Sequence, residues 1–419
     1  MTVDLPLLSD AFDDLRHELR NFRWQDKSTI VNEATVALDG GTALRVEVFL
    51  NEFWTSRQRA AHGLHELSYR ACFKPQLPRF FIERLTQPGD VVYDPFMGRG
   101  TTPIEAALLG RVPCGSDVNP LSAMLVEPRL HPPTAGAVAA RLQEMPWSDP
   151  GTTREDLLVF YHPETLAEIH ALRQYLLART ESGTLDWIDK WIRMVAVNRL
   201  TGHSAGFFSV YSLPPNQAVS IQSQKKINND RDQTPPRRKV PNLILAKTRA
   251  LLADCDAQVL SRLARTTERG QIFTGPAAGP SRLPANSVDL VVTSPPFLDV
   301  VDYATDNWLR CWFCGIDAKS IELTVLKRLG DWEAAMTAVF GELRRALKAG
   351  GHVAFEVGEV RAGTVRLEES VVKCALAAGL ETVLVLINSQ RFTKTANCWG
   401  VSNNTKGTNS NRIVVLRRP

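Results

Sequence analysis

Short hydrophobic runs, often β-branched, alternate with longer segments of helical hydrophobic spacing along most of this chain of 419 residues. Runs of this kind predict buried strands, and a spacing of three to four residues predicts helices. The expected strands are Val91–Tyr93, Val112–Asp117, Gln271–Thr274, Leu290–Val292 and Val353–Gly358. The expected helices are Asp10–Phe22, Pro78–Leu85, Pro103–Leu109, Leu157–Leu177, Leu185–Leu200, Asn242–Leu252, Asp306–Trp312, Trp332–Leu347 and Leu367–Ala377.

Strands that alternate with helices are typical of an α/β fold with a doubly wound, mostly parallel sheet. Glu381–Ile387 and Arg412–Leu416 predict an antiparallel hairpin that ends this sheet, and Ala34–Phe53 predicts an earlier hairpin with Gly40-Gly41 at its turn. Between Asp117 and Gln271 the pattern is mainly helical. We therefore expect an N-terminal extension at 1–60, a main domain formed by 61–130 and 271–419, and a largely helical insert at 131–270.

Composition narrows the class of protein without identifying it. The chain is 44% hydrophobic and 22% charged, which is ordinary for a globular protein, and its formal net charge of +4 is compatible with nucleic acid. No apolar run is long enough to cross a bilayer, and Met1–Leu5 lacks the pattern of a signal peptide. Seven cysteines spread thinly along the chain favour a reducing compartment, so we expect a cytoplasmic protein.

A glycine loop after the strand at Val91–Tyr93 carries the first candidate site. The loop reads Asp94-Pro95-Phe96-Met97-Gly98-Arg99-Gly100-Thr101-Thr102 and leads into a helix. Gly98 and Gly100 let the backbone approach a ligand, and Asp94 can bind a cationic amine. Asp117, roughly 20 positions after the loop, suits ribose hydroxyls. No Gly-Lys-Ser/Thr follows and a third glycine is missing, so neither a phosphate-binding loop nor a dinucleotide site is favoured.

A second candidate site follows the strand at Leu290–Val292. Thr293-Ser294-Pro295-Pro296-Phe297 stops that strand, because two consecutive prolines cannot donate backbone hydrogen bonds. Ligands of open α/β sheets bind at the carboxyl ends of strands. Hydroxyl and carbonyl oxygens of this turn can accept from an exocyclic amine, and Phe297 can stack on a planar ring. The turn therefore predicts a site for an amino-bearing base.

Ser294–Phe297 resembles the catalytic motif of DNA amino-methyltransferases, in which Ser-Pro-Pro-Tyr/Phe is associated with N4 of cytosine and Asp/Asn-Pro-Pro-Tyr/Phe with N6 of adenine. Asp94–Thr102 resembles motif I of S-adenosylmethionine methyltransferases. The resemblance covers roughly residues 62–125 and 270–415. It implies a Rossmann-like methyltransferase sheet, S-adenosyl-L-methionine as cofactor, double-stranded DNA as substrate and the inserted segment as target-recognition module.

The resemblance also implies a reaction and the residues for it. The target base leaves the duplex, and its amine attacks the sulfonium methyl directly, without a covalent enzyme intermediate. The implied catalytic residues are Ser294, Pro295, Pro296 and Phe297. The implied cofactor-binding residues are Phe73, Lys74, Asp94, Pro95, Phe96, Gly98, Gly100, Thr101, Thr102, Asp117 and Asn119.

Candidate DNA-binding residues lie in two polar segments. The window Lys225–Lys239 holds six basic and two acidic residues, and Arg391–Gly400 precedes an Asn-rich run. Basic side chains neutralise phosphates, and amides can read base edges. The expected contacts are Lys225, Lys226, Asn228, Arg231, Arg237, Arg238, Lys239, Arg391, Lys394 and Asn397. A cognate restriction endonuclease as partner and the oligomeric state stay open.

Several features depart from the pattern or imitate another one. Relatives usually carry an acid after the strand at Gln271–Thr274, and this chain has Gly275-Pro276-Ala277-Ala278. Cys114 follows a proline as in C5-cytosine methyltransferases, but it lies within the ribose strand, so we interpret it as a core residue. Cys311 and Cys314 have zinc-like spacing without a second pair, so we expect packing and no metal. Asp299 and Asp302 are the candidate proton acceptors.

Three alternatives remain at this stage. The same turn could methylate N6 of adenine, or present the N2 amine of guanine in RNA. The chain could also be a nucleic-acid-binding relative that has lost catalysis. The missing acid near Gly275 favours this alternative.

Overall fold

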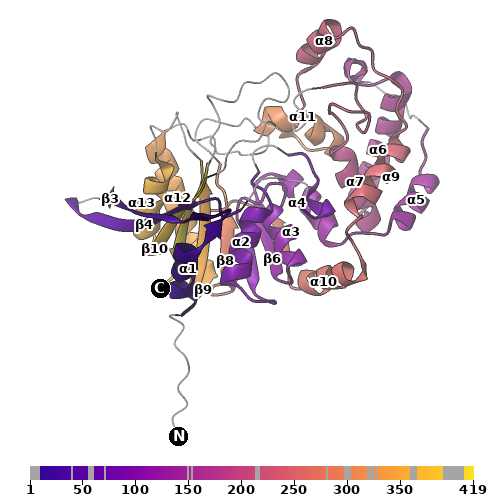
Figure 1. Cartoon of the computed structure of the whole chain (residues 1–419). Coiled ribbons are helices and arrows are strands. Elements are labelled where there is room, and N and C mark those ends of the chain that lie inside the picture. Colours follow the sequence, from indigo (N-terminus) through magenta and orange to yellow (C-terminus); the bar gives the residue numbers. More distant parts are fainter. Residues whose placement is uncertain are drawn as a thin grey trace.

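A nine-stranded sheet lies at the centre of the computed structural model, in the order β3-β4-β10-β11-β9-β8-β5-β6-β7 (Figure 1). The structure describes residues 10–38, 41–54, 61–69, 72–148, 151, 154–212, 218–279, 282–296, 303–318, 321, 326, 328–358, 366–389 and 410–419. Six candidate residues of the sequence analysis lie outside this part of the chain: Phe297, Asp299, Asp302, Arg391, Lys394 and Asn397.

The parallel core of the sheet agrees with the predicted strands. β5 (Val91–Asp94), β6 (Val112–Asp117), β7 (Gln271–Thr274), β8 (Val288–Thr293) and β9 (Leu347–Val357) pair in parallel. From β5 the chain proceeds through β6 to β7 on one side, and later through β8 to β9 on the other. The strand order therefore reverses between β5 and β8, which is the switch point where open α/β sheets bind ligands.

An antiparallel hairpin completes the sheet, as predicted. β10 (Glu381–Ser389) pairs with β11 (Ser410–Arg417), which lies between β10 and β9. β9 starts at Leu347, six residues before the predicted strand Val353–Gly358. Gly350 has a φ of +79° there, and the pairing with β8 shifts register between Val288 and Leu290.

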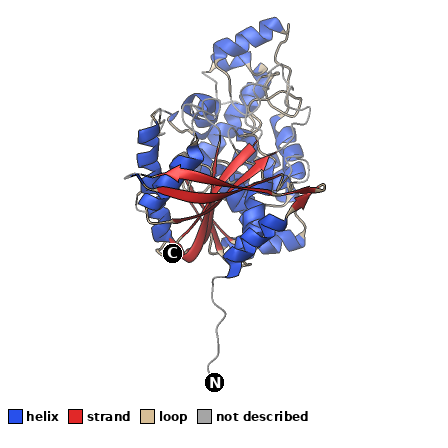
Figure 2. Ribbon diagram, turned by 60° about the vertical axis from the view of Figure 1, so that its left-hand side comes forward, coloured by secondary structure: helices blue, strands red, loops and turns tan. Residues whose placement is uncertain are grey.

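Helices cover both faces of the sheet (Figure 2). The side chains of Val291, Val353 and Phe355 face one core, shared with α12 (Leu329–Ala346) and α13 (Leu367–Ala377). The alternate positions Leu290, Val292 and Ala354 face a second core, shared with α1 (Asp10–Asn21) and α2 (Gln76–Leu85). Successive residues of a strand point to opposite faces, so the stretch Leu290–Val292 of β8 is apolar because it is buried on both.

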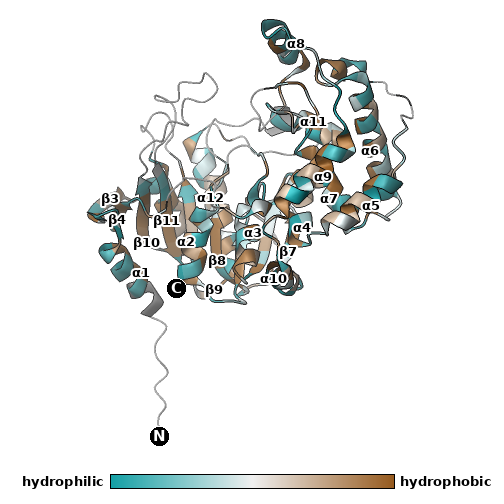
Figure 3. Cartoon of the chain, turned by 45° about the vertical axis from the view of Figure 1, so that its right-hand side comes forward, coloured by the Kyte–Doolittle hydropathy of each residue, from teal (hydrophilic) through white to brown (hydrophobic). Residues whose placement is uncertain are grey.

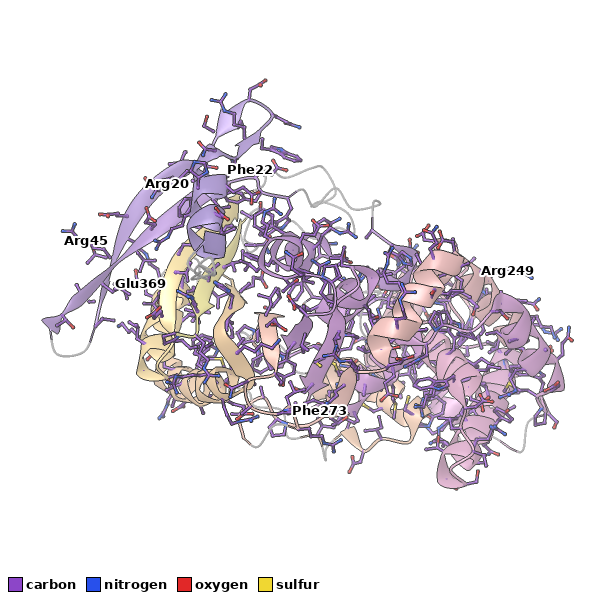
Figure 4. All side chains as sticks on the ribbon, turned by 90° about the horizontal axis from the view of Figure 1, so that it is seen from below. Arg20, Phe22, Arg45, Arg249, Phe273 and Glu369 are labelled. Carbon is purple, nitrogen blue, oxygen red and sulfur yellow. The ribbon has the colours of Figure 1, made fainter. Side chains whose placement is uncertain are left out.

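The N-terminal hairpin becomes part of the same sheet. β3 (Ile30–Ala37) and β4 (Ala43–Asn51) pair as predicted, and β4 also pairs in parallel with β10. Asn388 fixes this junction, since its Oδ1 accepts from the backbone N of Phe53 at 2.7 Å and of Trp54 at 3.2 Å. Seen from below, the hairpin with Arg45 lies at the opposite side of the molecule from Arg249 (Figure 4). A small ladder, β1 (Arg23–Trp24) with β2 (Lys27–Ser28), precedes it.

The region between β6 and β7 is helical, as predicted, with boundaries set by capping residues. The helix expected at Leu157–Leu177 divides into η3 (Glu155–Val159) and α6 (Pro163–Glu181), because Pro163 begins a helix that the side chain of His162 caps. The other helices are α4 (Pro120–Leu130), α5 (Ala135–Glu144), α7 (Trp187–Val197), α8 (Ile221–Asp230), α9 (Val240–Leu251) and α10 (Ala257–Thr267).

Four of these helices, α4, α5, α8 and α10, were not predicted. α8 occupies the first part of the basic window, for which no helix was predicted, and Ser220 caps it by accepting from the backbone N of Ser223 at 3.1 Å. α10 packs against α3 (Thr101–Leu108) and β6, although it falls within the range expected for the insert. A hydrophobic core that includes Trp191 of α7 and Leu309 of α11 (Tyr303–Cys314) connects the insert to the main sheet region. Among the described helices, none is both long and apolar enough to cross a membrane.

Candidate active site

The ends of β5 and β8 are joined by side-chain hydrogen bonds at the switch point of the sheet. Thr293 at the end of β8 donates from Oγ1 to Asp94 Oδ1 at 2.6 Å. Thr102, in the first turn of α3, donates to the carbonyl of Val292 at 2.9 Å. The predicted cofactor strand and the predicted catalytic turn are therefore in direct contact, one residue before Ser294.

The glycine loop has the backbone that the sequence predicted. Gly100 has a φ of +78°, and a Cβ at this position would lie 2.3 Å from Val126 Cγ2, so a larger residue cannot fit. Gly98 has a φ of +48°, and its N–H donates to Asp117 Oδ2 at 2.9 Å. Asn119 donates from its backbone N to the other oxygen of Asp117 at 2.9 Å. Asp117 thus fixes the glycine loop, and its binding to ribose stays a prediction.

The carboxyls of Asp94 and Asp117 both have raised pKa values. Asp94 is 1% exposed, and burial raises the pKa of its carboxyl to about 7, although hydrogen bonds from Thr293 and Phe96 oppose the shift. Burial likewise raises the pKa of Asp117. Neither carboxyl forms an ion pair with another residue that the structure describes. Two carboxyls without an ion partner at adjacent strand ends, Asp94 buried and Asp117 half-buried, fit a ligand that brings an ammonium group and hydroxyls, as S-adenosylmethionine does.

The segment before α2 lies against the glycine loop. The carbonyl of Phe73 accepts from Arg99 Nη2 at 3.4 Å and from Thr101 Oγ1 at 3.5 Å. Burial, and then the positive charge of Arg99, lowers the pKa of Lys74. Phe73 and Lys74 therefore lie beside the glycine loop, which begins at Asp94 and is held at Gly98 by Asp117.

Buried charges that the sequence analysis did not single out support this arrangement. Arg129 of α4 is buried completely and donates to the carbonyls of Leu64, at 3.0 Å, and Arg99, which ties the segment before α2 to the glycine loop. Burial, and secondarily Arg99, lowers the pKa of Arg129 to about 9. Glu105 of α3 accepts from His65 Nε2 at 2.7 Å and from Arg79 Nε at 2.6 Å.

Glu356 is the most important residue that the sequence analysis missed. It lies near the end of β9, beside the end of β8, and its carboxylate accepts hydrogen bonds from Asn411 Nδ2 at 2.7 Å and from the side chain of Ser294. Glu356 is 8% exposed, and burial raises the pKa of its carboxyl. An acid inside the apolar run Val353–Gly358 was the available sequence signal, since charged residues are rarely buried without a partner.

The predicted catalytic turn is also held from the side of α12. Trp332 of α12 is completely buried, and its Nε1 donates to the carbonyl of Pro296 at 3.2 Å. That carbonyl is therefore engaged within the protein. Ser294 and the carbonyl of Pro295 are the groups of the described turn that we expect to meet an amine.

Cys114, Cys311 and Cys314, whose spacing resembles that of other kinds of site, are core residues, as the sequence predicted. Cys114 is 2% exposed in β6, and burial raises the pKa of its thiol to about 11, which disfavours a nucleophilic thiolate. Cys311 and Cys314 are buried in α11 within the hydrophobic core. Within the described residues, no group of three or more His, Cys, Asp or Glu could hold a metal. The segment after β7 has no acid where members of the family usually carry one. Gly275 donates its backbone N–H to the carbonyl of Asp117 at 3.0 Å, and Ala277 is buried, so this segment offers only backbone groups there.

The predicted DNA-binding residues between 225 and 239 divide into two groups. Lys225 and Lys226 are exposed on α8, and neither pairs with an acid among the described residues. Arg237 instead pairs with Glu164 of α6, and Lys239 with Glu168 at 3.4 Å. Asn228 is held inside the module, because its Nδ2 donates to the carbonyl of Val159 at 2.7 Å. Arg231 lies over the ring of Tyr211, with Cζ 3.7 Å from the ring centroid, and Arg238 is half-buried.

Together, the strand order, the glycine loop and the paired acids define the α/β fold of S-adenosylmethionine-dependent methyltransferases. Residues 25–123 match the family model N6_N4_Mtase, whose description is DNA methylase, and this family implies S-adenosyl-L-methionine as cofactor. The matched part includes the glycine loop and Asp117, and ends before the catalytic turn.

Two type II methyltransferases are similar to part of this chain. M.MjaII of Methanocaldococcus jannaschii is 30% identical over 128 residues, which are 30% of this chain and 22% of that protein. M.MvaI of Kocuria varians is 31% identical over 117 residues, 27% of this chain and 24% of that protein. The chain thus matches about a quarter of the length of these curated relatives.

Two solved structures resemble this chain loosely. A putative DNA modification methylase from Thermus thermophilus is 23% identical, with 33% of this chain and 47% of that chain covered and a TM-score of 0.21. The rRNA methyltransferase AviRa from Streptomyces viridochromogenes is 12% identical, with 85% and 89% covered and a TM-score of 0.31. These superpositions are too loose to add to the strand order.

Proposed function

We propose that this protein is a DNA amino-methyltransferase that transfers a methyl group from S-adenosylmethionine to N4 of cytosine in double-stranded DNA. The observation that carries the proposal is the Thr293–Asp94 hydrogen bond of 2.6 Å, which joins the expected cofactor acid to the turn that begins with Ser294. A methyl donor and an amine acceptor held at these adjacent strand ends meet the main requirement of direct transfer, which is positioning. The family match at residues 25–123 and the two type II relatives support DNA as substrate.

The bound cofactor supplies an electrophilic methyl group on a sulfonium. The residues of the chain orient the acceptor: the hydroxyl of Ser294 and the carbonyl of Pro295 accept from the exocyclic amine, and Phe297 stacks on the base. The amine must lose a proton as its bond to carbon forms. Glu356 can take that proton through the Ser294 hydroxyl, because Ser294 already hydrogen-bonds to its carboxylate. This relay replaces Asp299 and Asp302 as our proposed proton acceptor.

The product of the reaction tests the proposed function. Duplex DNA incubated with the enzyme and cofactor, then digested to nucleosides for mass spectrometry, is expected to contain N4-methylcytosine. N6-methyladenine is the second candidate product, because the matched family includes both amines in its name. Detection of N6-methyladenine would show that Ser294–Phe297 acts on adenine. Methylated guanine in RNA without methylated DNA would overturn the proposal, and 5-methylcytosine would require a nucleophile such as Cys114.

Electrostatic contacts with DNA should come mainly from α8. Replacing Lys225 and Lys226 together by alanine is expected to weaken DNA binding and to reduce the salt dependence by a slope of ~0.9 for each lost phosphate contact. The matched pair Arg237→Ala and Lys239→Ala should change the slope less, because both side chains are already paired with acids of α6. Binding titrations between low and moderate salt compare the two variants. Equal salt-dependence slopes for the two variants would indicate that Lys225 and Lys226 are ordinary solvated surface residues without a specific role in DNA binding.

A further inference from the structure

α8 presents a polar stripe that the sequence analysis did not identify. Successive residues of an α-helix turn by about 100°, so positions i, i+3, i+4 and i+7 lie on one face. Gln222, Lys225, Lys226 and Asn229 have this spacing, and all four are exposed. The opposite face contains Ile221, Gln224, Ile227 and Asn228, which are buried or partly buried.

The inner face of α8 is fixed to the rest of the helical insert (131–270) by a polar network. Gln224 is completely buried, and its Nε2 donates to the carbonyl of Tyr211 at 3.0 Å and to Asn228 Oδ1 at 2.8 Å. Gln233 donates to the same two oxygens at 3.0 and 2.9 Å. Arg231 stacks on the Tyr211 ring directly after the helix. These four hydrogen bonds and the Arg231–Tyr211 stacking fix the orientation of α8, although Gln224 Oε1 has no partner among the described residues, so the outer stripe is held facing outward.

The outer stripe combines two kinds of group. The amides of Gln222 and Asn229 have no hydrogen-bond partner among the described residues, and each offers a donor and an acceptor together. The two lysines between them carry positive charge. Figure 3 shows α8 largely hydrophilic and extending from the rest of the insert. In Figure 1 α8 lies at the upper right of the molecule, above α11, the helix that follows the predicted catalytic turn in sequence.

The spacing of the stripe matches duplex DNA. Seven residues of an α-helix rise about 10.5 Å, and three base steps of about 3.4 Å cover nearly the same length. The major groove admits an α-helix, and Asn or Gln can bond to N6 and N7 of adenine with one donor and one acceptor. Lysines at the same face can contact guanine or neighbouring phosphates.

We propose that α8 is the recognition helix of this protein: it enters the major groove of double-stranded DNA, and Gln222 and Asn229 read base pairs about three steps apart. This inference rests on the proposed function, because it assigns the choice of target sequence to the same enzyme. Gln222 and Asn229 are specificity residues, and Lys225 and Lys226 supply affinity. Asn228, predicted from sequence to bind DNA, acts in this arrangement as part of the internal network.

The experiment measures sequence preference separately from rate. The full-length enzyme methylates a duplex library with randomised positions around a fixed cytosine, and sequencing of the methylated molecules gives a preference for each base. In Gln222→Ala and Asn229→Ala, discrimination is expected to fall about tenfold to a hundredfold at one base pair each, with the other positions unchanged. Lys225→Ala with Lys226→Ala should lower methylation of all sequences alike. Gln143→Ala, which removes an exposed glutamine of α5, is the matched control and should keep the wild-type preference.

The outcomes separate this inference from the proposed function. If wild type methylates DNA at a defined sequence and both amide variants keep the same preference at every position, α8 is not the reading helix and the proposed activity stands. If wild type methylates no DNA, the proposed function fails and the assignment of α8 fails with it. Cofactor affinity measured by calorimetry should be the same in every variant, which excludes a loss of folding as the cause.

Discussion

Turnover should fall about a hundredfold or more when Glu356 is replaced by glutamine, while cofactor affinity stays close to that of wild type. Glutamine keeps an acceptor for the Asn411 amide, at 2.7 Å from the carboxylate in the native protein, so the shape of the site is preserved. It cannot accept a proton through Ser294, and positioned general bases typically contribute 10²–10⁴-fold. Single-turnover methylation with saturating cofactor is the measurement, and Glu33→Gln on the exposed hairpin is the control for loss of a carboxylate elsewhere.

The same substitution should raise stability in one range of pH. Burial raises the folded pKa of Glu356 above its ordinary value of 4.5. The folded protein therefore binds this proton more tightly than the unfolded chain, and the carboxyl's contribution to stability falls as pH rises from about 4.5 through the folded pKa. Glutamine avoids that loss, so the melting temperature of Glu356→Gln should exceed that of wild type at neutral pH and approach it in acid. An inactive variant that is also less stable at neutral pH would indicate a merely structural role.

Cofactor affinity should depend on pH through Asp94. Its carboxyl has a pKa of about 7 in the protein without ligand, because it is buried without an ion partner. The ammonium group of the cofactor favours the ionised carboxylate, so binding releases a proton below this pH. Affinity should rise by up to tenfold per unit as pH increases toward about 7, then level off, and fall again above about 8, where an α-amino group loses its proton.

Asp94→Asn separates this effect from packing. Asparagine has nearly the same size and can still accept from Thr293, but it carries no charge. Affinity is expected to fall about tenfold or more, since a charge-assisted hydrogen bond is lost, and the rise toward neutral pH should disappear. Calorimetry in two buffers of different ionisation enthalpy measures the released proton directly. Equal affinity and equal pH dependence in wild type and Asp94→Asn would remove Asp94 from the cofactor site, and Asp14→Asn on α1 provides a surface control.

Both predictions concern groups whose function has a cost in stability. Asp94 and Glu356 are buried carboxyls with raised pKa values, a combination typical of functional sites. Thr293 and Ser294 connect them through adjacent positions of one chain segment. The predicted cofactor acid, the predicted catalytic turn and the proposed proton acceptor thus lie on three neighbouring strand ends, β5, β8 and β9.

The sequence by itself determined the elements whose signals are local. Apolar runs gave β5 to β8, and the paired prolines after Ser294 ended β8 where predicted. Glycines with positive φ, at Gly98 and Gly100, can be predicted because no other residue adopts that backbone at so little cost. The C-terminal hairpin and α13 agree with prediction for the same reason: periodicity and turn residues act within a few positions along the chain.

The tertiary structure decided what depends on contacts between distant segments. Glu356 meets Ser294 only because β9 pairs with β8, and the N-terminal hairpin joins the sheet only because β4 pairs with β10. α8 forms in a polar window with a weak local signal, since Gln224 and Asn228 find their partners at Tyr211 and Val159. Pairing and burial of this kind are set by the free energy of the whole packed sheet and module, which a local pattern of residues does not contain.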